Sequence, residues 1–330
     1  LYDLTQFDDY DEVLKRFGDS ADVPYRYGGG TYALPDTQSF YIMFYRRDIL
    51  EKLEIPVPET WDEFLAATAV LQRNNMQSWI PYTQITTSAT VNTGVGGLNL
   101  FASILQQHGG EFYNEEKSAT ALETPRALSA FTYWTDMYTK YKLPTTASFY
   151  NRFRLGTMPL GISTYTTYLT LYSAAPEIKG RWSIASVPGT AGGNDSVAGG
   201  GTGCSIIEKS KNKKEAWEFL KWWTAADTQT RYSNNVESLI GMLGRQATAT
   251  VDALKKMAWD SEDLDKILTQ WAKVKEVPEV PGSYYLGRAL DQAYWSVLND
   301  GVNAQDAIVK WSKAADSEIT RKIQEYSEGE

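Results

Sequence analysis

The side chains best placed for ligand chemistry form a polar cluster between two apolar segments. Asp36, Gln38 and Ser39 follow a Gly-rich turn and a short apolar run that ends at Pro35. The segment from Phe40 to Tyr45 comes next and is almost wholly apolar and aromatic, which is typical of a strand covered on both faces. Polar side chains between two buried strands become exposed where a chain crosses between two lobes. We therefore expect this cluster to contact a ligand, with hinge hydrogen bonding as the alternative.

A second candidate pair combines an aromatic ring with a planar cation. Tyr284 and Arg288 lie four residues apart at a predicted helix start, so they share one helix face. A sugar ring has apolar C–H faces and a rim of hydroxyls, so an aromatic ring stacks on the face while planar polar groups bond the hydroxyls. The alternative is an exposed aromatic shelf beneath an arginine. The loop from Tyr82 to Asn92, rich in Thr, Ser and Gln, is a further candidate for a cleft wall.

Residues for nucleophilic or metal-based catalysis are scarce. The single histidine, His108, precedes Gly109 at the end of a predicted helix, where interaction with the helix end is its ordinary role. Neither a nucleophile elbow nor a zinc-ligand spacing accompanies it. A glycosidase needs only two carboxylates, and the 41 acidic residues supply candidates without identifying a pair. We assign no catalytic residue, no metal site and no cofactor.

Composition excludes some classes of partner. The formal net charge of -9 and the isoelectric point near 4.9 argue against nucleic acid, whose phosphates require a basic face. The length of 330 residues suffices for two lobes with separate cores. Cys204 is the single cysteine and forms no internal disulfide. No segment has the apolar length of a membrane span, and no signal peptide is recognised.

Strand and helix signals alternate along the chain, which favours an α/β class with mixed sheets. Thr60 and Glu63 form a capping box at the start of one helix, and Thr124 with Pro125 opens another as N-cap and first-turn proline. The predicted helices span residues 47–54, 60–74, 98–108, 125–141, 213–223, 249–257, 264–274, 284–299 and 303–326. The clearest predicted strands span residues 40–45, 158–162, 182–187 and 204–207.

Several of these segments form motifs in a recognisable order. The first group is Tyr32-Ala33-Leu34-Pro35, Tyr45-Arg46-Arg47-Asp48, Leu53-Glu54-Ile55-Pro56 and Thr60-Trp61-Asp62-Glu63. Residues 153–162, 199–207 and 213–223 supply further matches. Together they resemble the family 1 extracellular solute-binding proteins of ABC sugar importers, a group that includes maltose-binding protein. Glu54 replaces the usual glycine of that family, a small departure within a loop.

The resemblance implies a fold of the periplasmic binding protein type II kind, with two lobes of mixed sheets and flanking helices. Lobe one would hold residues 1–38 and 200–249, and lobe two residues 40–197 and 250–330. Hinge crossovers are expected near residues 38–40, 197–201 and 245–250. The opening segment Leu1-Tyr2-Asp3-Leu4-Thr5 resembles a family segment that lies well inside the first lobe. We therefore expect an incomplete first lobe.

The resemblance also implies function. We expect a non-catalytic, monomeric receptor that binds a carbohydrate, most simply an oligosaccharide, and delivers it to ABC permease subunits from the periplasm or as a cell-surface lipoprotein. Contact with a membrane would occur only through a lost lipid anchor or the permease. Tyr165 and Tyr168 follow a predicted strand where family members often present an aromatic ring to the sugar. The alternatives are a glycan-active enzyme and a cell-surface interaction module without a small ligand.

Overall fold

A mixed sheet around one long strand organises most of the chain. The computed structural model describes residues 1–82 and 100–327. The central strand is β4 (Ser39–Arg46), and three strands pair with it antiparallel: β6 (Leu160–Thr164), β7 (Trp182–Ala185) and β8 (Val197–Gly200). Two short strands extend the sheet in parallel: β5 (Ser78–Trp79) beside β6 and β10 (Val274–Lys275) beside β8. The predicted α/β class with mixed sheets is confirmed.

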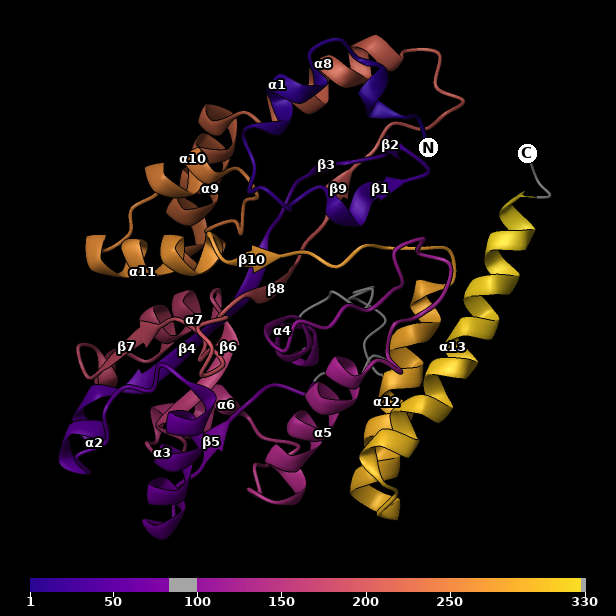
Figure 1. The fold of residues 1–330 in the computed structure, drawn as a ribbon. Helices are drawn as coiled ribbons and strands as arrows, with labels where there is room; N and C mark the ends of the chain where they lie inside the picture. The colour runs from indigo at the N-terminus through magenta and orange to yellow at the C-terminus, as the bar shows by residue number, and fades with distance from the viewer. Residues whose placement is uncertain (83–99, 328–330) are drawn as a thin grey trace.

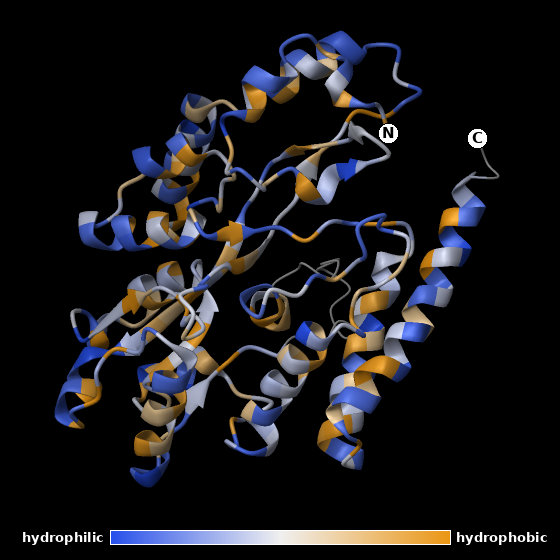
Figure 2. Cartoon of the chain, viewed as in Figure 1, coloured by the Kyte–Doolittle hydropathy of each residue, from blue (hydrophilic) through white to orange (hydrophobic). Residues whose placement is uncertain are grey.

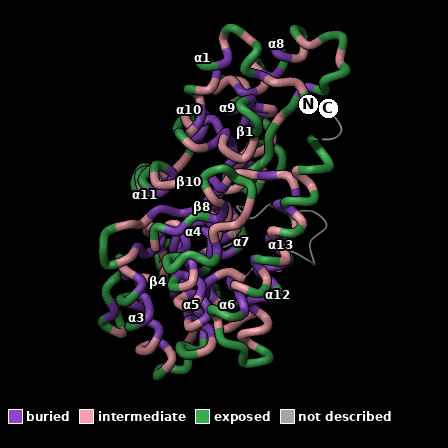
Figure 3. Tube along the Cα trace, turned by 45° about the vertical axis from the view of Figure 1, so that its right-hand side comes forward, coloured by how far each residue is buried: buried purple, intermediate pink, exposed green. Residues whose placement is uncertain are grey.

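Helices cover this sheet and enclose the larger of two hydrophobic cores. They are α2 (Arg47–Lys52), α3 (Trp61–Arg73), α4 (Leu100–Gln107), α5 (Pro125–Thr139), α6 (Phe149–Arg154), α7 (Thr167–Ala174), η3 (Pro176–Ile178), α12 (Ser283–Asp300) and α13 (Ala304–Ser327). Figure 1 shows α12 and α13 side by side next to α5, and hydrophobic and hydrophilic residues alternate along both, as expected of helices with one buried face (Figure 2). Buried residues concentrate around β4, β8, α4 and α5 (Figure 3).

A smaller hydrophobic core lies above the sheet in the view of Figure 1. Its elements are η1 (Leu4–Gln6), α1 (Tyr10–Leu14), η2 (Val23–Tyr25), β1 (Arg26–Tyr27), β2 (Gly30–Thr31), β3 (Leu34–Pro35), β9 (Gly203–Cys204) and α8 (Lys213–Trp223), followed by α9 (Ala226–Ile240) and η4 (Met242–Gly244). β3 and β9 pair antiparallel, and β1 pairs with β2. The buried residues of this core are Leu4, Tyr10, Val13, Phe17, Ala21, Leu34, Ile206, Trp217, Leu220 and Ala249.

Two further helices lie between the small core and the sheet. α10 (Val251–Lys256) packs on α9, and α11 (Ser261–Trp271) packs on β7 and β4. Their buried side chains Leu254, Met257, Ile267 and Trp271 belong to the large core. None of the helices in the described residues is both long and apolar enough to cross a membrane.

Local signals predicted most helices, and the differences have local causes. The helix Lys213–Trp223 is confirmed at both ends, and α3 begins with the capping box of Thr60 and Glu63. The helix predicted over residues 264–274 begins earlier, at Ser261, because Asp260 caps it, and ends at Trp271 so that Val274 joins the sheet. α6, α7 and α9 were not predicted. The buried residues of α9 are the polar Gln229 and Ser233, while its Leu239 and Ile240 are exposed.

Removing the N-cap hydroxyl of α3 is expected to destabilise the protein. Thr60 Oγ1 accepts a hydrogen bond from the Glu63 amide at 3.3 Å, and Glu63 Oε2 accepts one from the Thr60 amide at 3.1 Å. Thr60→Ala should lower the free energy of unfolding by about 1 kcal/mol, measured by urea denaturation. The control Thr146→Ala, at an exposed loop position, should leave it unchanged. Equal values for both variants would contradict the capping role.

Candidate functional site

Several distant chain segments meet where the small core joins the sheet. The chain leaves β3 and enters β4. β4 pairs with β8 at Ser39–Gly200 and Phe40–Gly199. The Asp36 amide bonds the Thr202 carbonyl at 2.8 Å, and the Gln38 amide bonds the Ala247 carbonyl at 2.9 Å. The segments predicted as crossovers near residues 38–40, 197–201 and 245–250 therefore lie side by side.

Gln38 and Glu276 form the centre of this junction. The Gln38 side-chain amide donates to Glu276 Oε1, although the residues are 238 positions apart in the chain. Both side chains lie directly against Gly199, where an added Cβ would lie 2.1 Å from Glu276 Oε1 and 2.5 Å from Gln38 Nε2. A side chain at this position would force both groups to move. The hinge hydrogen bond considered for Gln38 is therefore present, while a ligand contact by Gln38 stays a prediction.

The Glu276 carboxyl group is held in an unusual electrostatic state. The residue is 8 % exposed, and burial raises the pKa of its carboxyl group to about 7. The Gln38 hydrogen bond opposes this rise, and the neighbouring Glu279 adds to it. Burial also raises the pKa of Glu279, which accepts a hydrogen bond from Ser283 Oγ. The junction thus contains a carboxyl group that titrates near neutral pH.

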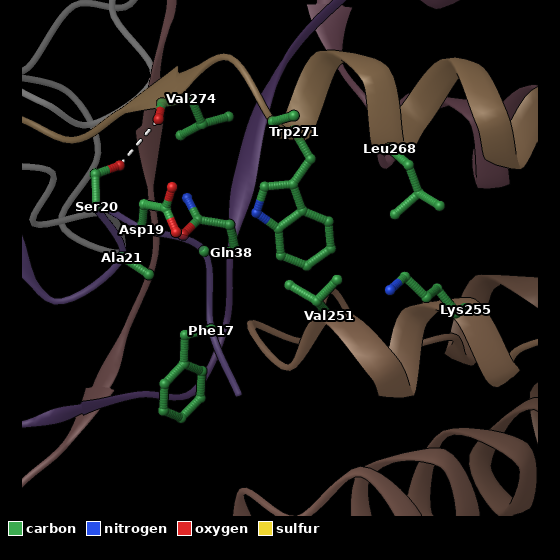
Figure 4. A pocket seen from close by; sticks show the side chains of 12 residues that line it. Phe17, Asp19, Ser20, Ala21, Gln38, Val251, Lys255, Leu268, Trp271 and Val274 are labelled. Atoms are coloured by element: carbon green, nitrogen blue, oxygen red, sulfur yellow. Dashed lines mark hydrogen bonds between the residues drawn. The ribbon is translucent and has the colours of Figure 1, made fainter. Parts of the chain in front are cut away.

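A cavity of about 380 Å³, called here the hinge cavity, opens beside Gln38 (Figure 4). Its lining residues are Phe17, Gly18, Asp19, Ser20, Ala21, Gln38, Val251, Lys255, Leu268, Trp271, Ala272 and Val274. The Trp271 indole projects between Val251 and Val274, with Asp19 and Lys255 on opposite sides (Figure 4). Ser20 Oγ donates to the Val274 carbonyl at 2.9 Å and so ties the small core to β10. The cavity combines an aromatic ring, a planar amide and two charged groups.

A second cavity, of about 330 Å³, contains a predicted site residue, Tyr168. We call it the aromatic cavity; its lining residues are Arg47, Tyr168, Leu171, Tyr172, Ala175, Lys179, Gly180, Trp182, Asp260, Glu262 and Asp263. Tyr168 donates to Asp263 Oδ2 at 2.8 Å, and its ring stacks on Tyr172 at 5.9 Å. Burial raises the pKa of Asp263. The arrangement of rings beside carboxylates can stack on and hydrogen-bond a sugar.

Tyr165 occupies a different environment from the one expected. Its amide bonds the Phe40 carbonyl at 3.0 Å, so the backbone continues the pairing of β6 with β4. This pairing turns the side chain into the core, where the residue is 1 % exposed and its ring stacks on Phe40 at 4.8 Å. Within the described residues the Tyr165 hydroxyl has no hydrogen-bond partner. The expectation that it presents its ring to a ligand is not favoured by this packing.

The predicted residues at the other positions are spread over separate regions. Asp36 accepts a hydrogen bond from Trp223 Nε1 at 2.7 Å, and Ser39 lies half-buried at the junction. Tyr82 stacks on Tyr294 at 4.1 Å and donates to Asp291 at 2.8 Å. The rest of the predicted loop, residues 83–92, lies outside the described residues.

Tyr284 and Arg288 are exposed on α12. Tyr284 donates to Glu318 of α13, and the Arg288 guanidinium lies 5.8 Å from the Tyr285 ring centre. Neither residue lines the hinge cavity or the aromatic cavity. The junction brings Asp36, Gln38 and Ser39 together but not this pair.

Sequence reasoning missed the partners of the predicted residues. Glu276, Trp223 and Trp271 each contact the polar cluster or line the hinge cavity, yet none was a candidate. A signal was present for Glu276, because it and Glu279 interrupt a Val- and Pro-rich segment. His108 has the local role expected of it, since its Nδ1 lies 2.8 Å from the Ile104 carbonyl. In the described residues no group of three or more His, Cys, Asp or Glu side chains could hold a metal.

The structure thus has two hydrophobic cores joined by adjacent strands, with the hinge cavity at the junction. The family model of bacterial extracellular solute-binding proteins matches residues 3–230, more than half of the chain. The chain therefore belongs to the bacterial extracellular solute-binding protein family.

Known proteins are similar to this chain along nearly its whole length. The maltotriose-binding protein of Pyrococcus abyssi is 23% identical over 357 residues, covering 98% of this chain and 65% of that protein. The structure of the sugar-binding protein MalE from Xanthomonas citri has a TM-score of 0.79 at 16% identity, covering 99% of this chain and 81% of the other. That of the cyclic alpha-maltosyl-1,6-maltose binding protein from Arthrobacter globiformis has a TM-score of 0.74 at 21% identity, covering 94% and 78%. At these identities the structural likeness shows the fold, and the type II-like architecture is confirmed.

Loss of the Tyr165 hydroxyl is expected to be harmless. Tyr165→Phe should keep or slightly raise the free energy of unfolding, because the buried hydroxyl has no partner among the described residues. Tyr168→Phe is the matched control, and it should lower that free energy by about 1 kcal/mol because it removes the bond to Asp263. Urea denaturation measures both. A larger loss for Tyr165→Phe would show that its hydroxyl has an important partner.

Proposed function

We propose that this solute-binding protein is a receptor that closes two lobes on a carbohydrate and delivers it to an ABC importer. The observation that carries the proposal is the family match over residues 3–230. The named relatives support the solute class, because one binds maltotriose and another binds cyclic alpha-maltosyl-1,6-maltose. An extracellular location, as a lipoprotein or in the periplasm, and a monomeric state belong to the same proposal.

The proposed lobes follow the two hydrophobic cores. Residues 1–38 and 200–249 form lobe one in this proposal, and residues 40–197 and 250–330 form lobe two. Every buried residue of the small core falls in the first set, and every buried residue of the large core except Ala198 falls in the second. Lobe movement would occur about the junction, where the residues 38–40, 197–201 and 245–250 lie together.

The proposed solute contacts lie at the junction, after β5 and in the aromatic cavity. Asp36 and Ser39 are half-buried at the junction, and Tyr82 is half-buried at the end of β5. In the aromatic cavity the proposed contact is Tyr168, which is itself only 3 % exposed, and Tyr172 beside it is 40 % exposed. This set suits a carbohydrate because its rings can stack on the faces of a sugar and its carboxylates can accept hydrogen bonds from the sugar hydroxyls.

Binding without chemistry is the proposed activity. The family is one of binding proteins, and the predicted site residues include no nucleophile paired with a base. The alternative of a glycosidase makes a different prediction, namely release of product from labelled oligosaccharides in proportion to the amount of protein. The alternative of an interaction module predicts no heat of binding with any glycan.

Maltotriose, the solute in a relative's name, is the first probe for this proposal. A solute that binds only the folded state stabilises it by about 2.7 kcal/mol at a hundredfold excess over Kd, so the Tm should rise by several degrees. Differential scanning fluorimetry with maltotriose, maltose and glucose measures the rise, and mannitol serves as a non-ring control. Intact maltotriose after prolonged incubation, checked by chromatography, is also expected. No shift with any mono- or oligosaccharide would refute the carbohydrate class.

A further inference from the structure

Three chain segments are fastened to one another at a single point of the junction. Gln38 belongs to the strand entering β4, Gly199 to β8, and Glu276 to the connector that follows β10. The Gln38 amide donates to the Glu276 carboxyl group, and both pack on the Gly199 backbone. The backbone amide of Glu276 also donates to Ser20 Oγ at 3.2 Å, which adds a tie to the small core.

We infer that Gln38 and Glu276 are a positioning pair that sets the angle between the lobes and thereby the affinity for the solute. The inference rests on the proposed receptor function and assigns Gln38 a role through the hinge instead of a direct contact. Gln38 is 2 % exposed and Glu276 is 8 % exposed, so neither offers its polar group to bulk solvent. A rotation that separates the connector from β4 would break their bond and admit water to the carboxyl group.

The surroundings of Glu276 make this bond sensitive to protonation. In the described residues no salt bridge reaches Glu276, and its side-chain donor is Gln38. The titratable and charged groups that face it or share its neighbouring cavity are Glu279 of the same connector, Tyr25 of η2, and Glu111, Tyr113, Glu115 and Lys117. Only one of these, Lys117, is a cation, so ionisation of Glu276 is poorly compensated where it lies.

The sign of the pH dependence follows from this burial. The pKa of Glu276 in the described arrangement is about 7, above its ordinary value of 4.5. Protonation of Glu276 therefore stabilises the arrangement in which it is buried. This stabilisation is complete below the ordinary pKa of 4.5 and is lost as the pH rises through about 7. At high pH Glu276 is ionised, so an arrangement in which water reaches its carboxyl group becomes more populated. The lobe angle should thus change between pH 5 and pH 8.

Small-angle X-ray scattering and maltotriose titration calorimetry at pH 5, 6.5 and 8 test the inference. The wild type should change its radius of gyration and its Kd across this range, and Glu276→Gln, which mimics the protonated group, should change neither. Glu279→Gln is the matched control, since it removes a second buried carboxyl group of the connector that does not bond Gln38. This control should retain the pH dependence.

A swapped pair separates positioning from simple loss of packing. Gln38→Ala should alter the Kd about tenfold, as expected for the loss of one buried hydrogen bond. The double variant Gln38→Glu with Glu276→Gln keeps one amide and one carboxyl group in contact and should recover the wild-type Kd. A pH response of Glu276→Gln equal to that of the wild type, or a swap no better than Gln38→Ala, would overturn the inference. If maltotriose does not bind the wild type, the scattering data alone decide the hinge, and the fluorimetry screen with the other sugars decides the solute class.

Discussion

A hydrogen bond between a buried amide and a buried carboxyl group holds the junction of this molecule together. Gln38 and Glu276 meet over Gly199, where any added Cβ would overlap both groups and force them to move. The strand pairing of β4 with β8 and the bond from Ser20 to Val274 surround this contact and bring the small core onto the sheet. A carboxyl group is an unusual choice for such a place, because burial disfavours its charged form. An amide group in its place would accept the Gln38 hydrogen bond without making it depend on pH.

The aromatic residues, which make up 13% of the chain, are used mainly for packing. Tyr82, Trp134, Tyr138 and Tyr294 form a continuous group between α5 and α12, with ring centres between 4.1 and 6.2 Å apart. Tyr165 joins a similar group with Phe40 and Trp271. Such groups stabilise a large core, since each ring buries a large apolar area and stacks favourably on its neighbours. Among the rings that stay exposed, that of Tyr172 in the aromatic cavity lies beside carboxylates.

Prediction from the sequence succeeded where the signal was local. The capping box at Thr60 and Glu63, the Thr124 N-cap with Pro125, and the helix Lys213–Trp223 all depend on residues within a few positions of one another, and all are confirmed. The family followed from motifs in order, and the family match confirms it. The ligand contact expected of Tyr165 stays a prediction; the sequence shows an aromatic residue after a strand but not which way its side chain turns. The continued pairing with Phe40 turns it inward.

The sequence by itself determined the α/β class, the family and the position of the polar cluster between two strands, because these depend on composition, periodicity and short motifs. Only the tertiary structure decided what that cluster contacts. Asp36 bonds Trp223, and Gln38 bonds a carboxyl group 238 residues away. Such contacts are set by the register of β4 against β8 and by the course of the connector after β10, and neither leaves a pattern in any short stretch of sequence. Likewise, the raised pKa of Glu276 arises mainly from its burial among segments distant in the chain.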